Sequence, residues 1–160
     1  MGAETGIGMI DAIYNERVLA LAADIPRLGR LPHPDASAKA HSKLCGSTVV
    51  VDLTVREGKI ADFAHDVKAC ALGQASSSLM ARHAIGASLA DVESLRAQVA
   101  AMLKEGGPPP SGAFAEFAVL EPVKDYKARH ASTLLTFEAT LDAFKQALAK
   151  QALAKQAAPA

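Results

Sequence analysis

Two cysteines are the residues of this chain best suited to chemistry. Cys45 and Cys70 are its two thiols, and both stand beside residues typical of irregular backbone, namely Gly46 after the first and a serine-rich segment after the second. Thiolates act as nucleophiles and bind zinc, iron and iron–sulfur clusters. Two thiols are too few for a disulfide framework or for a zinc site of four cysteines. In a reducing compartment we therefore expect them to be free, metal-bound or reactive.

A predicted β-hairpin brings the two cysteines together. Residues 48–56 are rich in β-branched side chains, a second extended run covers 60–67, and Gly58 lies between the two runs. Strands that pair about residue 58 place Cys45 opposite residue 71, where directly opposed Cα atoms lie roughly 5 Å apart. The sequence thus predicts a paired thiol site at the open end of one hairpin.

Helices are predicted on both sides of this hairpin. A helix that begins just after Cys70 would direct its unsatisfied N–H groups at that sulfur and favour the thiolate. Residues 30–44 show no clear period, so we expect a loop that leads to Cys45. The other expected helices cover 9–24, a stretch from a capping box at Ser88 and Asp91 to Glu105, the short segment 113–120, and a long final stretch from Lys127 or Ala128.

The length of 160 residues and the order of these elements indicate one domain over residues 1–150. We expect an α+β fold, in which a small antiparallel sheet of about three strands is packed on one side by helices. The pattern does not place the third strand. A five-residue Lys-Gln-Ala-Leu-Ala repeat fits no single helical face, so residues 151–160 are expected to form a frayed or disordered low-complexity tail.

The charge balance excludes several classes of partner. Seventeen Lys and Arg residues oppose seventeen Asp and Glu residues, which argues against binding to nucleic acid or to a membrane surface. The N-terminal residues lack the pattern of a secretory signal, and no apolar run approaches the ~20 residues of a membrane helix. We therefore expect a cytoplasmic protein.

Four segments carry a resemblance to a known family. They are Tyr14 with Pro26-Arg27-Leu28-Gly29, then Cys45-Gly46-Ser47, then Cys70-Ala71-Leu72-Gly73-Gln74-Ala75-Ser76-Ser77-Ser78, and finally Arg129-His130-Ala131-Ser132-Thr133-Leu134-Leu135-Thr136-Phe137. Their order and types resemble the iron–sulfur cluster assembly scaffolds of the NifU, IscU and SufU type, over about residues 11 to 146. The resemblance implies the NifU/IscU-like fold and a site for iron or a nascent cluster.

The chain departs from the family pattern at the site itself. The family holds a nascent cluster or a zinc ion with three cysteines and an aspartate, whereas here the resemblance places Ser47 at the aspartate and Ser132 at the third cysteine. A neutral hydroxyl is a poor ligand for iron unless the metal deprotonates it. Two thiolates would need further ligands from His130, from Ser132 as an alkoxide, from a second subunit in a homo-oligomer, or from an exogenous thiol.

Three interpretations of the function follow. The first is a scaffold or carrier, not an enzyme, in which Cys45 and Cys70 bind iron or a nascent iron–sulfur cluster. As the resemblance implies, it would accept sulfur from a cysteine desulfurase and pass the cluster to apo iron–sulfur proteins. The alternative is a degenerate scaffold-fold protein that binds zinc or acts as an interaction or regulatory module without assembling clusters. The third, an enzyme that pairs Cys70 with His130, has no supporting spacing.

Overall fold

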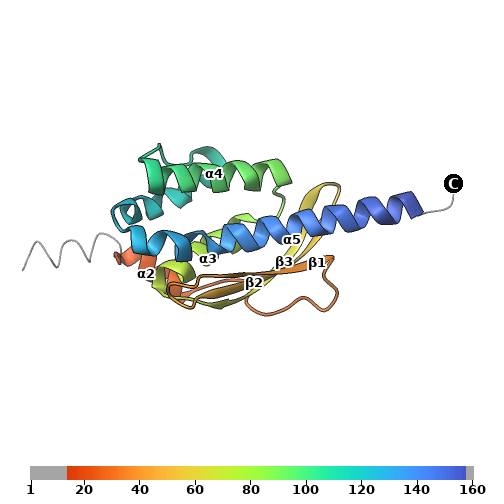
Figure 1. The fold of residues 1–160 in the computed structure, drawn as a ribbon, viewed down its shortest axis with the longest axis horizontal. Coiled ribbons are helices and arrows are strands. Elements are labelled where there is room, and N and C mark those ends of the chain that lie inside the picture. The colour runs from red at the N-terminus through yellow and green to blue at the C-terminus, as the bar shows by residue number, and fades with distance from the viewer. Residues whose placement is uncertain (1–13, 158–160) are drawn as a thin grey trace, which may run out of the picture.

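A three-stranded antiparallel sheet forms one layer of the computed structural model, which describes residues 14–157 (Figure 1). Helices α3 and α5 pack on one face of the sheet, and α4 packs on α5 from the other side. This arrangement confirms the expected α+β class. The elements are α2 (Glu16–Ala23), β1 (Ala36–His41), β2 (Thr48–Arg56), β3 (Lys59–Lys68), α3 (Ala71–His83), α4 (Leu89–Glu105), the 3₁₀ segments η1 (Gly112–Asp125) and η2 (Lys127–Arg129), and α5 (His130–Ala157).

The β2–β3 hairpin has the predicted register. Thr48 pairs with Lys68 and Val49 with Val67, so the pairs from Thr48 to Thr54 are centred on residue 58. The register shifts between Thr54 and Val55, next to the turn. The turn is tight because Glu57 and Gly58 both take positive φ, of 55° and 75°, as two-residue hairpin turns of type I′ require. The register therefore brings the end of β3 beside the segment that precedes β2.

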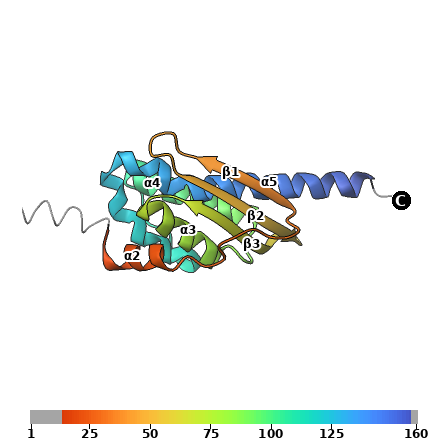
Figure 2. The ribbon, with the colours of Figure 1, turned by 90° about the horizontal axis from the view of Figure 1, so that it is seen from below.

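The third strand lies where a loop was expected. Within 30–44, Ala36–His41 forms β1, which pairs antiparallel with β2 at one edge of the sheet (Figure 2). Small alanines alternate with polar residues in this strand, and Ala38 is its one buried residue. Alanine has low β-propensity, so the strand forms because β2 supplies its hydrogen bonds and not because of its own composition.

Two helix starts differ from the prediction. Helix α2 begins at Glu16, where Asn15 caps it by accepting a hydrogen bond from the Val18 N–H at 3.0 Å, and the earlier residues 9–13 of the expected helix lie outside the described residues. Helix α5 begins at His130, two to three residues later than expected, because η2 takes the preceding turn. Helix α3 begins directly after Cys70, as predicted.

The segment between α4 and α5 is a 3₁₀ run. Helix α4 has the predicted capping box of Ser88 and Asp91 and ends at Glu105. The expected short helix 113–120 is instead part of η1, which continues through Pro122 to Asp125. Its buried residues, Phe117, Leu120 and Val123, recur at a spacing of three, which is the period of a 3₁₀ helix.

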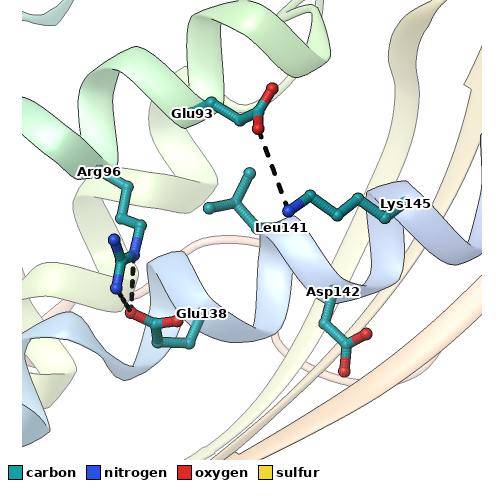
Figure 3. Close-up of a pocket in the computed structure, with 6 residues that line it drawn as sticks. All are labelled: Glu93, Arg96, Glu138, Leu141, Asp142 and Lys145. Atoms are coloured by element: carbon teal, nitrogen blue, oxygen red, sulfur yellow. Dashed lines mark hydrogen bonds and ion pairs between the residues drawn. The ribbon is translucent and has the colours of Figure 1, made fainter.

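Helix α5 connects the layers along its length. Its buried side chains include Phe137 and Phe144, which lie in the core between the sheet and the other helices. On the side of α4, Arg96 bonds to Glu138 at 2.7 Å and Lys145 lies 4.0 Å from Glu93 (Figure 3). These pairs are partly exposed, so packing rather than charge holds α4 on α5.

The C-terminal repeat is helical, which contradicts the expected frayed tail as far as Ala157, whereas residues 158–160 lie outside the described residues. Helix α5 runs on to Ala157, and residues 149–157 are exposed. Gln151 anchors the first part of this extension, because its Nε2 donates to the Val55 carbonyl at 2.8 Å. Continuation of a buried helix adds residues without a new nucleation step, so a repeat that fits no single face can still be helical.

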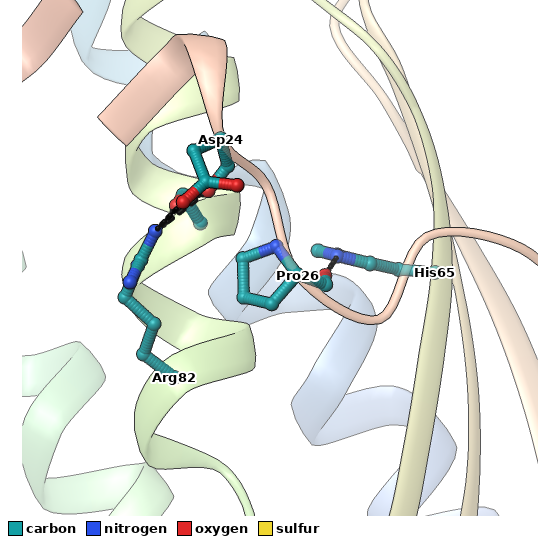
Figure 4. Close-up of polar contacts among 5 residues, drawn as sticks. Asp24, Pro26, His65 and Arg82 are labelled. Carbon is teal, nitrogen blue, oxygen red and sulfur yellow. Dashed lines mark hydrogen bonds and ion pairs between the residues drawn. The ribbon is translucent and has the colours of Figure 1, made fainter. Parts of the chain in front are cut away.

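The connection from α2 to the sheet is fixed by hydrogen bonds to its backbone. Arg82 and Ser78 of α3 donate to the Asp24 carbonyl, at 2.6 and 3.2 Å, and His65 Nε2 donates to the Pro26 carbonyl at 2.9 Å (Figure 4). His65 is fully buried, and this burial lowers its pKa. A neutral His65 therefore holds the connection against the edge of β3.

A buried carboxylate fixes the outer side of the sheet. Asp52 of β2 accepts hydrogen bonds from Arg30 at 2.7 and 3.0 Å, from the Ser37 hydroxyl at 2.6 Å and from the Leu31 N–H at 3.0 Å. Burial alone raises the pKa of Asp52, but the hydrogen bonds outweigh it and hold the pKa below its ordinary value. Asp52 therefore stabilises the fold as an anion and ties the segment before β1 to the central strand.

We expect Asp52→Asn to lower the free energy of unfolding at pH 7 by about 2 kcal/mol, because charged hydrogen bonds are lost. A lowered carboxyl pKa gives stability that is present above the unfolded value and is lost as pH falls through the folded value. The difference between the two proteins should thus shrink below about pH 4. Urea unfolding between pH 3 and 7 measures it, and a constant difference over that range would contradict this role.

Candidate metal centre

Three elements meet at the end of the sheet that carries the cysteines. Cys45 lies in the connection between β1 and β2, residues 42–47. Cys70 is the N-cap of α3, and Ser132 lies in the first turn of α5. Residues far apart in sequence thus converge here, as the hairpin register predicted for the two cysteines.

The serine hydroxyls link the two sulfurs. The Cys70 thiol lies 3.6 Å from Ser132 Oγ, to which it donates, and Cys45 Sγ lies 2.9 Å from Ser47 Oγ. The Ser132 hydroxyl also interacts with the Cys45 sulfur. The structure therefore brings together Cys45, Ser47, Cys70 and Ser132, which are four of the five predicted site residues.

The surroundings of Cys45 favour its thiolate. The Ser47 hydroxyl, then the nearby Ser42 hydroxyl and the Ser47 N–H, lower the pKa of Cys45 to about 7, with a smaller contribution from Ser132. Cys45 is exposed, whereas the three serines are buried. A sulfur that is accessible and about half ionised at neutral pH can bind a metal or act as a nucleophile.

Ser42 was not found from the sequence. It is 4% exposed, and its N–H donates to the Ser47 carbonyl at 2.9 Å, which closes the β1–β2 connection. Its place beside Cys45 depends on β1 being a strand. Because the sequence did not predict β1, no signal in the sequence placed Ser42 near the thiol.

Gly73 sets the distance between α3 and α5 beside the site. A Cβ at this position would lie 2.7 Å from the Ala69 Cβ and 3.3 Å from the Ser132 carbonyl oxygen. A glycine here therefore lets the first turn of α3 lie against the start of α5. The available signal was a glycine three residues after Cys70 inside a helical segment, where glycine is otherwise unfavourable.

His130 lies on the same turn as Ser132, but one of its ring nitrogens is already engaged. Its Nε2 bonds to the carbonyls of Val123 at 3.0 Å and Lys124 at 3.2 Å, so this nitrogen carries a proton and has no lone pair for a metal. Ligation by His130 would have to use Nδ1. Among residues 14–157, no group of three or more His, Cys, Asp or Glu side chains is placed to hold a metal ion.

The structure has an α+β fold, and its two thiols lie where a hairpin end meets two helix starts. These features are those of the scaffold type that the sequence resembles. Residues 13–133 match the NifU-like N terminal domain. The chain therefore belongs to the family of NifU-like N-terminal domains, which confirms the resemblance. Within residues 14–157, no helix is both long and apolar enough to cross a membrane.

Individual relatives agree with this assignment. The crystal structure of the N-terminal part of a nitrogen-fixing NifU-like protein from Brucella abortus is 58% identical, covers 89% of this chain and 99% of its own, and superposes with a TM-score of 0.87. The iron–sulfur cluster assembly scaffold protein IscU of Thermotoga maritima is 25% identical over 84% of this chain and 94% of its own. FiSufU from Fervidobacterium islandicum is 20% identical over 84% of this chain and 98% of its own, with a TM-score of 0.77, and shows the fold alone.

Removal of the Ser47 hydroxyl should raise the pKa of Cys45 from about 7 toward its ordinary value, because this hydroxyl contributes most to lowering it. Alkylation of Cys45 by iodoacetamide, followed against pH in a Cys70→Ala background, measures the midpoint. We expect Ser47→Ala to slow alkylation at pH 7 several-fold, since the thiolate is the reacting form. The exposed Ser94→Ala serves as the matched control, and an unchanged midpoint in Ser47→Ala would exclude this role.

Proposed function

We propose that this chain is an iron–sulfur cluster assembly scaffold that holds iron or a nascent cluster between Cys45 and Cys70. The observation that carries the proposal is the convergence of both sulfurs on Ser132 within a NifU-like domain. Iron and the cluster are the cargo of such a protein, which passes them on to apo iron–sulfur proteins. A scaffold of this kind binds and transfers and is not an enzyme.

The two thiols are suited to different parts of this task. Cys45 is exposed and its pKa is about 7, so its thiolate is available to a partner that delivers sulfur, which we propose is a cysteine desulfurase. Cys70 is half-buried at the start of α3, so its sulfur is the more fixed of the two ligands. Thiolate sulfur is the ligand that iron–sulfur clusters prefer.

Ser132 occupies the position of a weak third ligand. Its hydroxyl donates to the Arg129 carbonyl at 3.2 Å, and it would have to give up this proton to bind iron as an alkoxide. Ser47, His130 through Nδ1, or a second subunit in a homo-oligomer are the other proposed sources of ligands. A site with few strong ligands has open coordination positions on its metal. This suits a protein that must release its cluster in the cytoplasm.

A second candidate function is a zinc-binding or regulatory module that keeps the scaffold fold but builds no cluster. The observation that favours it is the pair of serines, Ser47 and Ser132, at positions where the resemblance places an aspartate and a cysteine. Two thiolates with hydroxyls and water can still hold zinc, which accepts four-coordinate sites with mixed ligands. Metal analysis of the purified protein separates the two functions.

Anaerobic incubation of the protein with ferrous iron, sulfide and a thiol should produce the visible absorption of an iron–sulfur cluster. We expect Cys45→Ala and Cys70→Ala each to reduce this absorption to near the level without protein, because one remaining thiolate cannot hold the iron. Ser94→Ala, on the exposed side of α4, should retain it. A colourless wild-type protein with stoichiometric zinc would overturn the proposal in favour of the second function.

A further inference from the structure

We propose that Cys70 is a resolving thiol, which attacks a persulfide carried on Cys45 and releases its outer sulfur as sulfide. This inference rests on the proposed function and deepens it, because it names the source of the electrons that convert delivered sulfur into sulfide. Sulfur delivered as a persulfide must gain two electrons before it can become the sulfide of a cluster. In a site with two thiols, the second thiol is the nearest source.

The geometry places Cys70 next to any sulfur bound on Cys45. Thr48 pairs with Lys68, so the register of β2 and β3 brings the Cys45 connection beside Cys70. Ser132 Oγ contacts the Cys70 thiol at 3.6 Å and also interacts with the Cys45 sulfur. Within the described residues, these are the two free cysteines. Gly46, directly after Cys45, has φ of 71°, and its N–H donates to the Ser42 carbonyl at 2.8 Å, so a defined turn positions Cys45 at this end of the sheet.

The orientation of Cys45 decides which sulfur is attacked. Its Sγ faces the buried hydroxyls of Ser42, Ser47 and Ser132, whereas the residue itself is exposed. The inner sulfur of a persulfide would therefore stay on the side of Cys70, and the outer sulfur would extend toward solvent. Attack on the inner sulfur releases sulfide, whereas attack on the outer sulfur would only move the persulfide to Cys70.

The reaction balances without another oxidant or reductant. The thiolate of Cys70 attacks Sγ of the Cys45 persulfide, a Cys45–Cys70 disulfide bond forms, and the bond between Sγ and the outer sulfur breaks. The outer sulfur leaves as hydrosulfide with its own proton and has gained two electrons. The two cysteine sulfurs have together lost two electrons, as in any thiol–disulfide exchange.

The disulfide product determines the order of events at the site. A disulfide offers no thiolate to iron, so the pair must be reduced before it binds metal again. The reduction of this disulfide needs a dithiol, such as one of the thioredoxin class, which reduces a protein disulfide by thiol–disulfide exchange. Sulfide release and metal binding are therefore alternate states of the same two residues.

The test uses the full-length, metal-free protein with glutathione persulfide as the sulfur donor, in the presence of a chelator and without oxygen. Wild-type protein should release about one sulfide per chain and end with a Cys45–Cys70 disulfide, which peptide mass spectrometry detects. Cys70→Ser should instead keep a persulfide on Cys45. Cys70→Ser also reports the sulfide that the donor releases by itself. We expect wild type to release sulfide roughly tenfold faster than Cys70→Ser, or more, because the attacking thiol is held near the persulfide.

Equal sulfide release by wild type and folded Cys70→Ser, as judged by circular dichroism, would overturn the inference. A persulfide found on Cys70 of the wild-type protein would do the same, because it would show attack on the outer sulfur. The proposed function is tested separately, because cluster assembly from inorganic sulfide needs no persulfide. If clusters form from inorganic sulfide but no sulfide is released from glutathione persulfide, the scaffold function stands and the resolving role of Cys70 is excluded.

Discussion

The site depends on the close approach of α3 to α5 at Gly73. A side chain at this position would meet Ala69 and the Ser132 carbonyl, so the absence of one allows the start of α3 to lie against the start of α5. This contact brings Cys70 to Ser132, and the β2–β3 register brings the Cys45 connection to the same place. Neither thiol is positioned by its own neighbours in sequence alone. The proposed ligand set therefore depends on helix packing as much as on the two cysteines.

The serines shape the electrostatics of the site, most directly at Cys45. A carboxylate beside Cys45 would disfavour a second negative charge, whereas the neutral Ser47 hydroxyl donates a hydrogen bond to the thiolate. Ser132 likewise bridges the two sulfurs where a third thiol would compete with them for charge. The result is an accessible thiolate with one partner thiol, which suits sulfur acceptance and a weakly held metal.

The sequence predicted the parts of the fold that local chemistry determines. The hairpin register follows from β-branched strands around Gly58, the α4 start follows from the Ser88 capping box, and the α3 start after Cys70 was expected. Strand β1 was missed because its alanines carry no strand signal and its partner β2 lies elsewhere in the chain. The helical C-terminal repeat was missed for a related reason, since a buried helix and the Gln151 contact extend it.

Part of the site was equally beyond prediction from the sequence. Cys45, Cys70, Ser47 and Ser132 came from the hairpin and the family resemblance, and they meet in the structure. The contributions of Ser42 and Gly73 depend on tertiary contacts, and the sequence offered a signal only for Gly73, as a glycine inside a helical segment.

The central claim is that Cys45 and Cys70 form one ligand set in which Ser132 takes the place of a third ligand. The lifetime of the reconstituted cluster in Ser132→Cys, compared with wild type in the presence of a chelator, tests this claim most directly. A third thiolate at this position should bind iron more strongly than a hydroxyl, so the account predicts a longer lifetime. An unchanged lifetime in a folded Ser132→Cys protein would contradict the claim, because it would show that residue 132 does not face the bound metal.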